Sequence, residues 1–308
     1  MNLGHIESLD LDAFMAMQES QFVQPASTWR EEVLSLVRHG SKPTGDYLPW
    51  NKTADKFRLR EKEVTLWAGI NGHGKSLFVG QVALWLLNHT RVLIASMEMP
   101  PAKTIERMLA QAAGTGEPSD KFSEWFMDNT NNLHIYDQLD SVEPDRVIAM
   151  IRYAAQELGV KHVIIDNLAK CVRGTDDYSA QKDFIDRVCW AAKSQNIHIH
   201  IVHHIRKGRS EEDIPDKFDV KGAGEITDLV DNAVLIHRNK KKERLKSAGE
   251  ECDEPDTRML VRKQRHGNWE GSIAFWYVPL GERGGQYVSR PGAGCMPWPN
   301  PDEQWRAV

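Results

Sequence analysis

The segment Gly69-Ile-Asn-Gly-His-Gly-Lys-Ser76 combines the residue types that hold the phosphates of a nucleotide. Gly69, Gly74, Lys75 and Ser76 have the spacing G-x-x-x-x-G-K-[ST], in which the glycines let backbone N–H groups close around phosphate oxygens. The lysine neutralises phosphate charge, and the serine hydroxyl ligates Mg²⁺. The sequence therefore predicts a site for ATP, or another NTP or dNTP, with Mg²⁺. Its predicted nucleotide-binding residues are Gly69, Asn71, Gly72, His73, Gly74, Lys75 and Ser76.

The residues around this segment predict the elements that hold it in place. Residues 64–68 form an apolar run that is typical of a buried strand, and residues 77–88 are predicted to form a helix that is apolar on nearly all sides. A helix that begins at the glycine-rich turn directs unpaired N–H groups and the positive end of its dipole toward the phosphates. Chance produces this four-residue match about once in a hundred chains of this length.

The rest of the core alternates between strands and helices. Strands are predicted at 91–96, 133–136, 162–165 and 197–202, with helices at 102–114, 145–158 and 179–194. Continuous β-branched runs separated by helices indicate a parallel sheet covered on both faces, with ligands at the carboxyl ends of its strands. Four later strands, at 233–237, 259–263, 272–278 and 286–289, are predicted to be antiparallel, with an exposed, mobile excursion at 240–256.

Two carboxylates follow predicted strands at the edge where the nucleotide would bind. Asp166 ends the strand at 162–165, a position from which it can reach the Mg²⁺ beside Ser76. Glu98 lies just past the strand at 91–96 and would orient a water molecule for hydrolysis, if that strand is next to the strand that precedes the phosphate loop. An ordinary turn role for each residue is the alternative.

The histidines at 198, 200, 203 and 204 do not have the spacing of a metal site. Alternation along a strand places His198, His200 and His204 on one face but spreads them over about 20 Å, too far for one tetrahedral centre. His204 stands at the carboxyl end of the strand, where it can hydrogen-bond a γ-phosphate. His198 and His200 are predicted to pack within the sheet.

A loop that follows this strand, residues 206–225, carries basic residues at its two ends and acidic residues as well. Long loops in compact domains are usually functional. Backbone N–H groups and lysines there are able to hold a phosphodiester backbone without reading base sequence. The predicted DNA-binding residues are Arg206, Lys207, Arg209, Lys217, Lys221, Gly222 and Gly224. The alternative is a solvated loop surface.

Composition limits the classes of protein to consider. The 308 residues carry a net charge of −5, which does not fit a protein that coats duplex DNA, so any contact with nucleic acid must be local. The four cysteines form no C-x-x-C pair, which argues against a zinc ribbon and a secreted disulfide scaffold. No apolar run approaches a membrane span, and no targeting segment is evident. We expect a cytoplasmic protein of a bacterial cell or a phage-infected host, without membrane contact.

The predicted organisation has three parts. Residues 1–44 form an arm with a helix at about 28–39, in which Trp29, Val33, Leu36 and Val37 share one apolar face after the capping-box pattern at Thr28. Residues 45–290 form the nucleotide-binding domain, and residues 291–308, rich in proline, form a tail that lies on the surface or is disordered. The helix in the arm packs either on its own domain or on a neighbouring subunit.

The order of these features resembles the ring-shaped replicative helicases of the DnaB family. The resemblance covers roughly residues 45–290 and is strongest in the pair Ser96-Met-Glu-Met-Pro100 and Lys263-Gln-Arg-His-Gly267. It implies a RecA-like P-loop core of the α/β class, a mostly parallel sheet between helices, and antiparallel strands at the C-terminal end. It also implies an ATP-dependent DNA helicase that translocates on single-stranded DNA and unwinds duplex DNA as a hexameric ring.

The resemblance also assigns roles to matching positions. Glu98 would be the catalytic base, assisted by Lys75, and His204 would sense the γ-phosphate. Lys263 and Arg265 would act in trans on the nucleotide of the adjacent subunit, and the helix at 28–37 would be a swapped linker helix. A replication fork, a primase, a polymerase and a loader are the implied partners, and priming itself is expected to be absent. Two alternatives are a recombinase-type ATPase that binds single-stranded DNA without unwinding it, and a ring ATPase that does not bind DNA.

Overall fold

The structure of this protein is a computed structural model. It describes residues 23–39, 44–172, 177–205, 212–216, 219–220, 223–296 and 298. The chain divides into two units, residues 1–44 and residues 45–308. In the first unit, a 3₁₀ turn at Ala26–Trp29 leads into helix α2, Arg30–His39. The α-helix thus begins two residues after Thr28, and Trp29, Val33, Leu36 and Val37 are exposed.

The second unit is built on one sheet. Within the described residues its nine strands follow the order β3-β2-β4-β5-β1-β6-β7-β8-β9. The first six of these are parallel to their neighbours, and β7, β8 and β9 continue the sheet in antiparallel fashion. The strands are β1 Val64–Gly69, β2 Val92–Ser96, β3 Leu133–Ile135, β4 His162–Asp166, β5 His198–His204, β6 Asn232–Arg238, β7 Thr257–Gln264, β8 Gly271–Pro279 and β9 Gly285–Val288. The predicted α/β class with antiparallel C-terminal strands is confirmed.

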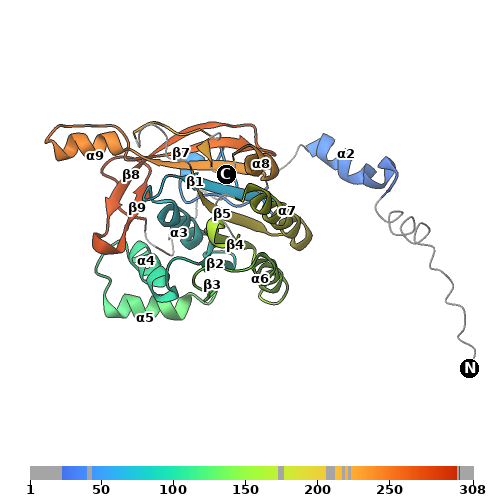
Figure 1. Cartoon of the computed structure of the whole chain (residues 1–308), viewed down its shortest axis with the longest axis horizontal. Coiled ribbons are helices and arrows are strands. Elements are labelled where there is room, and N and C mark those ends of the chain that lie inside the picture. The colour runs from blue at the N-terminus through green and yellow to red at the C-terminus, as the bar shows by residue number, and fades with distance from the viewer. Residues whose placement is uncertain are drawn as a thin grey trace, which may run out of the picture. The chain divides into compact units, whose positions relative to one another are not determined.

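Helices cover both faces of the sheet, as Figure 1 shows. The side chains of α3, α4 and α5 pack on one face, together with Trp50 and Phe57 from the segment before β1. The side chains of α6, α7 and α8 pack on the opposite face. These helices are α3 Lys75–Leu86, α4 Pro101–Ala113, α5 Asp120–Asn129, α6 Pro144–Gln156, α7 Tyr178–Gln195 and α8 Ala223–Leu229.

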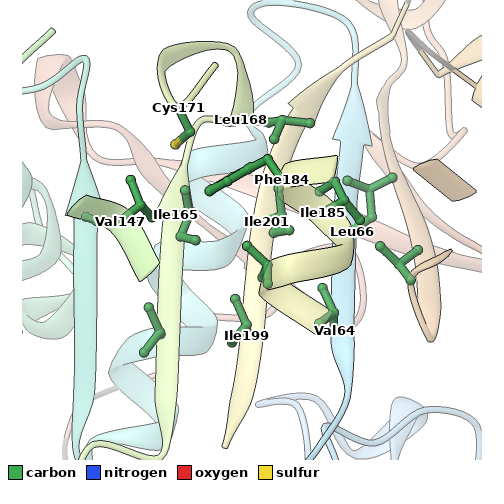
Figure 2. Packing of buried hydrophobic residues seen from close by; sticks show 14 of the residues in the cluster. Val64, Leu66, Val147, Ile165, Leu168, Cys171, Phe184, Ile185, Ile199 and Ile201 are labelled. Carbon is green, nitrogen blue, oxygen red and sulfur yellow. The ribbon is translucent and has the colours of Figure 1, made fainter. Parts of the chain in front are cut away.

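Alternation along the central strands separates the two cores. Figure 2 shows Val64, Leu66, Ile199 and Ile201, from β1 and β5, in the same buried cluster as Phe184 and Ile185 of α7. The intervening residues of β1 and β5 point to the face of α3, whose helix is buried nearly all round. On that face β1 and β5 carry Trp67 and Val202 but also buried Thr65, His198 and His200, so β5 alternates between histidine and isoleucine rather than forming a continuous apolar run.

Four features differ from the sequence-based expectation. The short helices α5 and α8 were not predicted, and the expected mobile excursion at 240–256 contains helix α9, Lys240–Ser247, in which Lys242 is buried beside Asp256. Strand β2 is separated from β1 by β4 and β5. The two strands are therefore not neighbours, although the predicted role of Glu98 assumed that they are. In the C-terminal segment, Trp298 packs against Trp125 and Phe126 of α5 and is 9% exposed. This residue is thus anchored to the fold.

Among the described helices, none combines the length and the apolar character required to cross a bilayer.

Candidate nucleotide site

A cavity of about 400 Å³ opens at the carboxyl ends of the parallel strands. Eight residues singled out in the sequence line it together, although they come from four separate segments. They are Asn71, Gly72, Gly74, Lys75, Ser76, Glu98, Asp166 and His204. Arg107, Leu77 and Gly284 complete the lining. The sheet thus assembles the predicted nucleotide, magnesium and catalytic residues in one place.

The sheet register explains why Glu98, Asp166 and His204 meet. Ser96 of β2 pairs with Asp166 of β4, and Asp166 pairs with Val202 of β5. Glu98 and His204 each lie two residues beyond this row, which keeps them on the same face of the sheet. His204 also pairs with Gly69, at the start of the phosphate loop. Glu98 therefore reaches the cavity across β4, without the direct contact between β2 and β1 that the sequence analysis required.

The phosphate loop depends on two left-handed glycines. Gly72 and Gly74 have φ values of +78° and +81°, which other residues adopt only with strain. A Cβ atom on Gly74 would lie 2.1 Å from the Tyr287 hydroxyl oxygen, whereas one on Gly72 would meet nothing within 4 Å. Gly74 is also the N-cap of α3. No side chain among the described residues caps this end of the helix. The first-turn N–H groups of α3 are therefore directed at an anion site.

Lys75 is held at the floor of this loop. Its Nζ atom donates to the carbonyl oxygens of Gly69 and Ile70, at 3.0 Å each. Burial lowers the pKa of Lys75 to about 8, although the nearby Asp166 and Glu98 carboxylates act in the opposite direction. A phosphate would favour the charged lysine in the same way, so the loop fits a polyphosphate ligand.

Asp166 and Ser76 form the part of the cavity that suits a divalent cation. Burial raises the pKa of Asp166, while its hydrogen bond with Ser76 works in the opposite direction. A hydroxyl beside a carboxylate is an oxygen donor set of the kind that Mg²⁺ accepts. These residues therefore fit the cation that accompanies a nucleotide triphosphate. Among the described residues, no group of three or more His, Cys, Asp or Glu has the arrangement of a metal site.

Glu98 and His204 are joined by a residue that the sequence analysis did not single out. The Asn167 Nδ2 atom donates to Glu98 Oε1 at 2.6 Å and lies 3.0 Å from His204 Nε2. Asn167 itself is 1% exposed. Its position directly after the strand-ending Asp166 was the available signal, but a polar residue there is common in turns.

Arg107 is the second residue that the sequence analysis missed. It lies on α4 and lines the cavity, where its positive charge acts on Asp166. Ile105, Met108 and Leu109 of α4 pack toward the core. Arg107 stands at the border of this apolar face, where a helical pattern predicts only a solvated side chain. Only the fold shows that this border faces the nucleotide cavity.

His73 and Gly69 belong to the loop but do not line the cavity. His73 is fully buried beside His237 of β6, and its Nδ1 atom accepts the backbone N–H of Arg238 at 3.1 Å. Burial, assisted by the charge of His237, lowers the pKa of His73 to about 4, so the ring is neutral. In this structure, the His73 side chain ties the loop to β6.

Lys263 and Arg265 lie away from the cavity of their own chain. Lys263 Nζ donates to the carbonyl oxygens of Thr227 and Asp228 at 2.8 Å, and Arg265 donates to those of Asp228 and Leu229 at 3.2 and 3.3 Å. Arg265 Nε is also 3.4 Å from Asp231 Oδ1. Both cations therefore hold the C-terminal end of α8, where the helix dipole favours positive charge.

The predicted DNA-binding residues fall mainly outside the described residues. This is true of Arg206, Lys207, Arg209, Lys217, Lys221 and Gly222, and Gly224 belongs to the backbone of α8. Four acidic side chains of the same loop are described, those of Glu212, Asp213, Asp216 and Asp219, and two of them form ion pairs with the domain. Glu212 accepts from Arg244 at 2.8 Å, and Asp216 lies 3.7 Å from Arg262.

Comparison with known proteins decides the family. The model of an AAA domain family, AAA_25, matches residues 20–210 of this chain, which is more than half of it. This chain belongs to the AAA domain family. It is 26% identical over 204 residues to the DNA helicase/primase of Enterobacteria phage T3, an alignment that covers 58% of this chain and 36% of that protein. The AAA domain protein described here thus spans about a third of that relative's length.

Solved structures agree on the fold of this AAA domain protein. A DnaB-like replicative helicase, studied with regard to its interactions with primase, superposes with a TM-score of 0.67 at 16% identity, over 91% of this chain and 71% of the other. The ATPase domain of G40P superposes with a TM-score of 0.68 at 15% identity, over 87% of this chain and 99% of the other. The predicted resemblance to the DnaB family and the RecA-like fold are thereby confirmed.

Proposed function

We propose that this AAA domain protein is the ATP-hydrolysing motor of a replicative DNA helicase, which translocates on single-stranded DNA and unwinds duplex DNA. The observation that carries this proposal is the convergence of Lys75, Ser76, Glu98, Asp166 and His204 on one cavity in a fold shared with DnaB-like helicases. The relationship to a phage DNA helicase/primase supports DNA as the substrate.

In the proposed reaction, the N–H groups of the phosphate loop and Lys75 hold the polyphosphate of ATP or a related NTP. Mg²⁺, held by Ser76 and Asp166, would supply positive charge to the β- and γ-phosphates. Glu98 accepts the proton of the attacking water, and His204 donates a hydrogen bond to the γ-phosphate. Arg107, on the wall of the cavity, adds a fixed positive charge for the transition state.

We propose further that the protein acts as a homo-oligomeric, hexameric ring. Lys263 and Arg265 do not line the cavity of their own chain, which is what a pair serving the adjacent subunit requires. To act there, they must leave the carbonyl oxygens at the end of α8. The swapped-helix role of α2 fits its exposed apolar face.

We also propose a DNA-binding role for the loop at 206–225, whose basic residues lie outside the described residues. It is supported by the pairing of Glu212 with Arg244 and of Asp216 with Arg262, which neutralises two of the acidic residues that balance the loop's charge. Helix α9 also carries a group of basic residues, but it is less suited to DNA because acidic residues pair with four of them, namely Lys240, Lys241, Lys242 and Arg244. A primase, a polymerase or a loader would be a further partner at the fork.

Hydrolysis and strand displacement test the function directly. We expect ATP hydrolysis that is stimulated by single-stranded DNA, together with ATP-dependent displacement of a strand from a forked duplex, and we expect Lys75→Ala to abolish both. Stimulation without displacement would support the recombinase-type alternative, and hydrolysis that ignores DNA would support the ring ATPase that does not bind DNA. Native mass measurement with nucleotide and DNA tests for six subunits.

Subunit mixing tests the assignment in trans. Arg265→Ala and Lys75→Ala subunits are each expected to be inactive as pure assemblies. A mixture should recover part of the hydrolysis, since an intact Arg265 on one chain then faces an intact Lys75 on the next. If mixed assemblies form but stay inactive, the trans role of Arg265 is wrong.

A further inference from the structure

Asn167 occupies a special position between the two residues that we assign to the γ-phosphate. Its single amide nitrogen approaches Glu98 Oε1 and His204 Nε2 at 2.6 and 3.0 Å. A side-chain amide nitrogen carries two N–H groups, so it can serve both acceptors at once. Glu98 follows β2 and His204 ends β5, and β4 lies between those strands. Asn167, directly after β4, therefore bridges the gap that separates them.

The bridge fixes the hydrogen-bonding state of His204. Nε2 accepts from Asn167 only if its lone pair is unprotonated, which places the ring proton on Nδ1 in the neutral histidine. Rotation of the Asn167 amide would turn Oδ1 toward the carboxylate of Glu98. Both groups are hydrogen-bond acceptors, so this orientation is unfavourable. Glu98 thus holds the orientation of the amide, and the amide in turn holds the tautomer of His204.

The Nδ1 atom of His204 is buried, and donation to a phosphate from Nε2 requires the opposite arrangement. To donate a hydrogen bond from Nε2, the ring must carry its proton there, and it can then no longer accept from Asn167. The buried Oδ1 atom of Asn167 has no hydrogen-bond partner among the described residues. It is the acceptor that a protonated Nε2 would find, but only if the amide turned and left Glu98.

We propose that Asn167 is a positioning residue that couples His204 to the carboxylate of Glu98, so that contact with the γ-phosphate resets the orientation of the catalytic base. This inference rests on the proposed hydrolytic function. Asn167 itself touches no reacting atom in this scheme. Its effect is exerted through Glu98 and is therefore on turnover rather than on nucleotide affinity.

The chain supplies a matched control. Asn232 is also fully buried, and its Nδ2 atom donates to Glu63 Oε2 at 2.9 Å and to Thr65 Oγ1 at 3.1 Å. Its Oδ1 atom, like that of Asn167, has no partner among the described residues. Asn232→Ala and Asn167→Ala therefore remove equivalent buried amides, one far from the cavity and one beside it.

Steady-state hydrolysis without DNA is the first test. For Asn167→Ala we expect kcat to fall by about 10- to 100-fold, with KM within about threefold of the wild-type value. Asn167→Asp, which places a second acceptor beside Glu98, should be at least as impaired. Asn232→Ala should lose comparable stability in urea unfolding but keep kcat. An unchanged kcat in Asn167→Ala, or a KM that rises in proportion to the loss, would overturn the proposal.

A double mutant separates coupling from a local effect. If Asn167 acts between His204 and Glu98, adding Asn167→Ala to His204→Ala should lower kcat by less than about threefold, because the coupling is already lost. Fully multiplicative losses would contradict the proposed link.

The tautomer of His204 provides a readout that needs no hydrolysis. In ¹⁵N-histidine spectra, assigned by loss of a signal in His204→Gln, the nucleotide-free wild type should show His204 with its proton on Nδ1. Asn167→Ala should shift the ring toward the Nε2–H tautomer, and Asn232→Ala should not. An identical His204 signal in all three proteins would refute the bridge. Absence of DNA stimulation would refute the helicase function while leaving this result intact.

Discussion

Strand β5 carries histidines at both of its ends, and the two ends serve different purposes. At its start, His198 and His200 are fully buried. His198 contacts the Thr65 hydroxyl at 2.9 Å and the carbonyl oxygen of Arg60 at 2.6 Å. His200 accepts from Trp67 Nε1 at 3.1 Å and contacts His162 at 3.1 Å. At the other end, half-buried His204 lines the nucleotide cavity.

The difference shows how placement in the sheet gives one residue type two roles. All three side chains lie on the face of the sheet that α3 covers. At the start of β5, further partners continue the network, since Asp46 accepts from both His162 and His89. Protein groups thus surround the rings there, and the network serves stability. At the carboxyl end His204 contacts Asn167 and also lines the cavity, where a histidine can meet a ligand.

Replacing the histidine at each end should give opposite results, and His204→Ala should show the larger effect. Loss of a donor to the γ-phosphate should lower kcat by roughly 100-fold, about 2.7 kcal/mol in the barrier. The free energy of unfolding should change by less than about 1 kcal/mol, because the ring borders a cavity. ATPase assays and urea unfolding measure both. A large loss of stability with normal kcat per folded molecule would place His204 with the structural histidines.

The reverse result is expected for His200→Ala. The substitution removes a partner from Trp67 Nε1 and from His162, both buried, and should lower the free energy of unfolding by about 2 kcal/mol. Hydrolysis per folded molecule should stay within about twofold of the wild type. If kcat falls sharply while stability is kept, the two ends of β5 are not functionally separate.

Acid should destabilise the protein through the network at the start of β5. Burial lowers the pKa of His198 to about 3 and that of His200 well below its usual value. Below pH 6.5 the unfolded chain binds protons that the folded chain excludes, so stability that is complete above pH 6.5 is lost as the pH falls. The loss should approach about 1.4 kcal/mol per pH unit for each histidine.

Urea unfolding between pH 6.5 and 4.5 tests this slope. His198→Gln should make the profile shallower, and an unchanged slope would exclude the His198 contribution. Asp46 does not interfere in this window. Burial raises the pKa of Asp46, but the hydrogen bonds from His162 and His89 outweigh burial and hold it well below 3.8. Its contribution to stability is present above its ordinary pKa and is lost only at lower pH.

The comparison also shows what the sequence was able to predict. The separation of His204 from His198 and His200 followed from their places along one strand, and the phosphate loop followed from local spacing. These are local patterns. Asp46 and His162, by contrast, meet the histidines through the order of strands in the sheet, which one sequence does not reveal. Asn167 and Arg107 were missed for the same reason, since their local patterns are those of a turn residue and a solvated helix residue.

The position of Glu98 gives a more instructive case. Its role was predicted on the condition that β2 is next to β1, and that condition is wrong. The residue still reaches the cavity because strand alternation and the β2–β4–β5 register, rather than adjacency to β1, place it on the face of α3. A predicted residue can therefore reach the expected cavity even though the strand order assumed for it is incorrect.

Alkaline pH should produce the smallest of these effects, a loss of nucleotide affinity at the carboxyl end of the sheet. Burial lowers the pKa of Lys75 to about 8 in the free protein, and bound phosphates favour its charged form. Nucleotide affinity should therefore be insensitive to this group below pH 7 and should fall about tenfold between pH 7 and 9. Titration with a fluorescent ATP analogue measures it, with Lys75→Arg as the control because arginine stays charged. Parallel curves for the two proteins would show that another group governs the decline, whereas a flat control beside a falling wild type would assign it to Lys75.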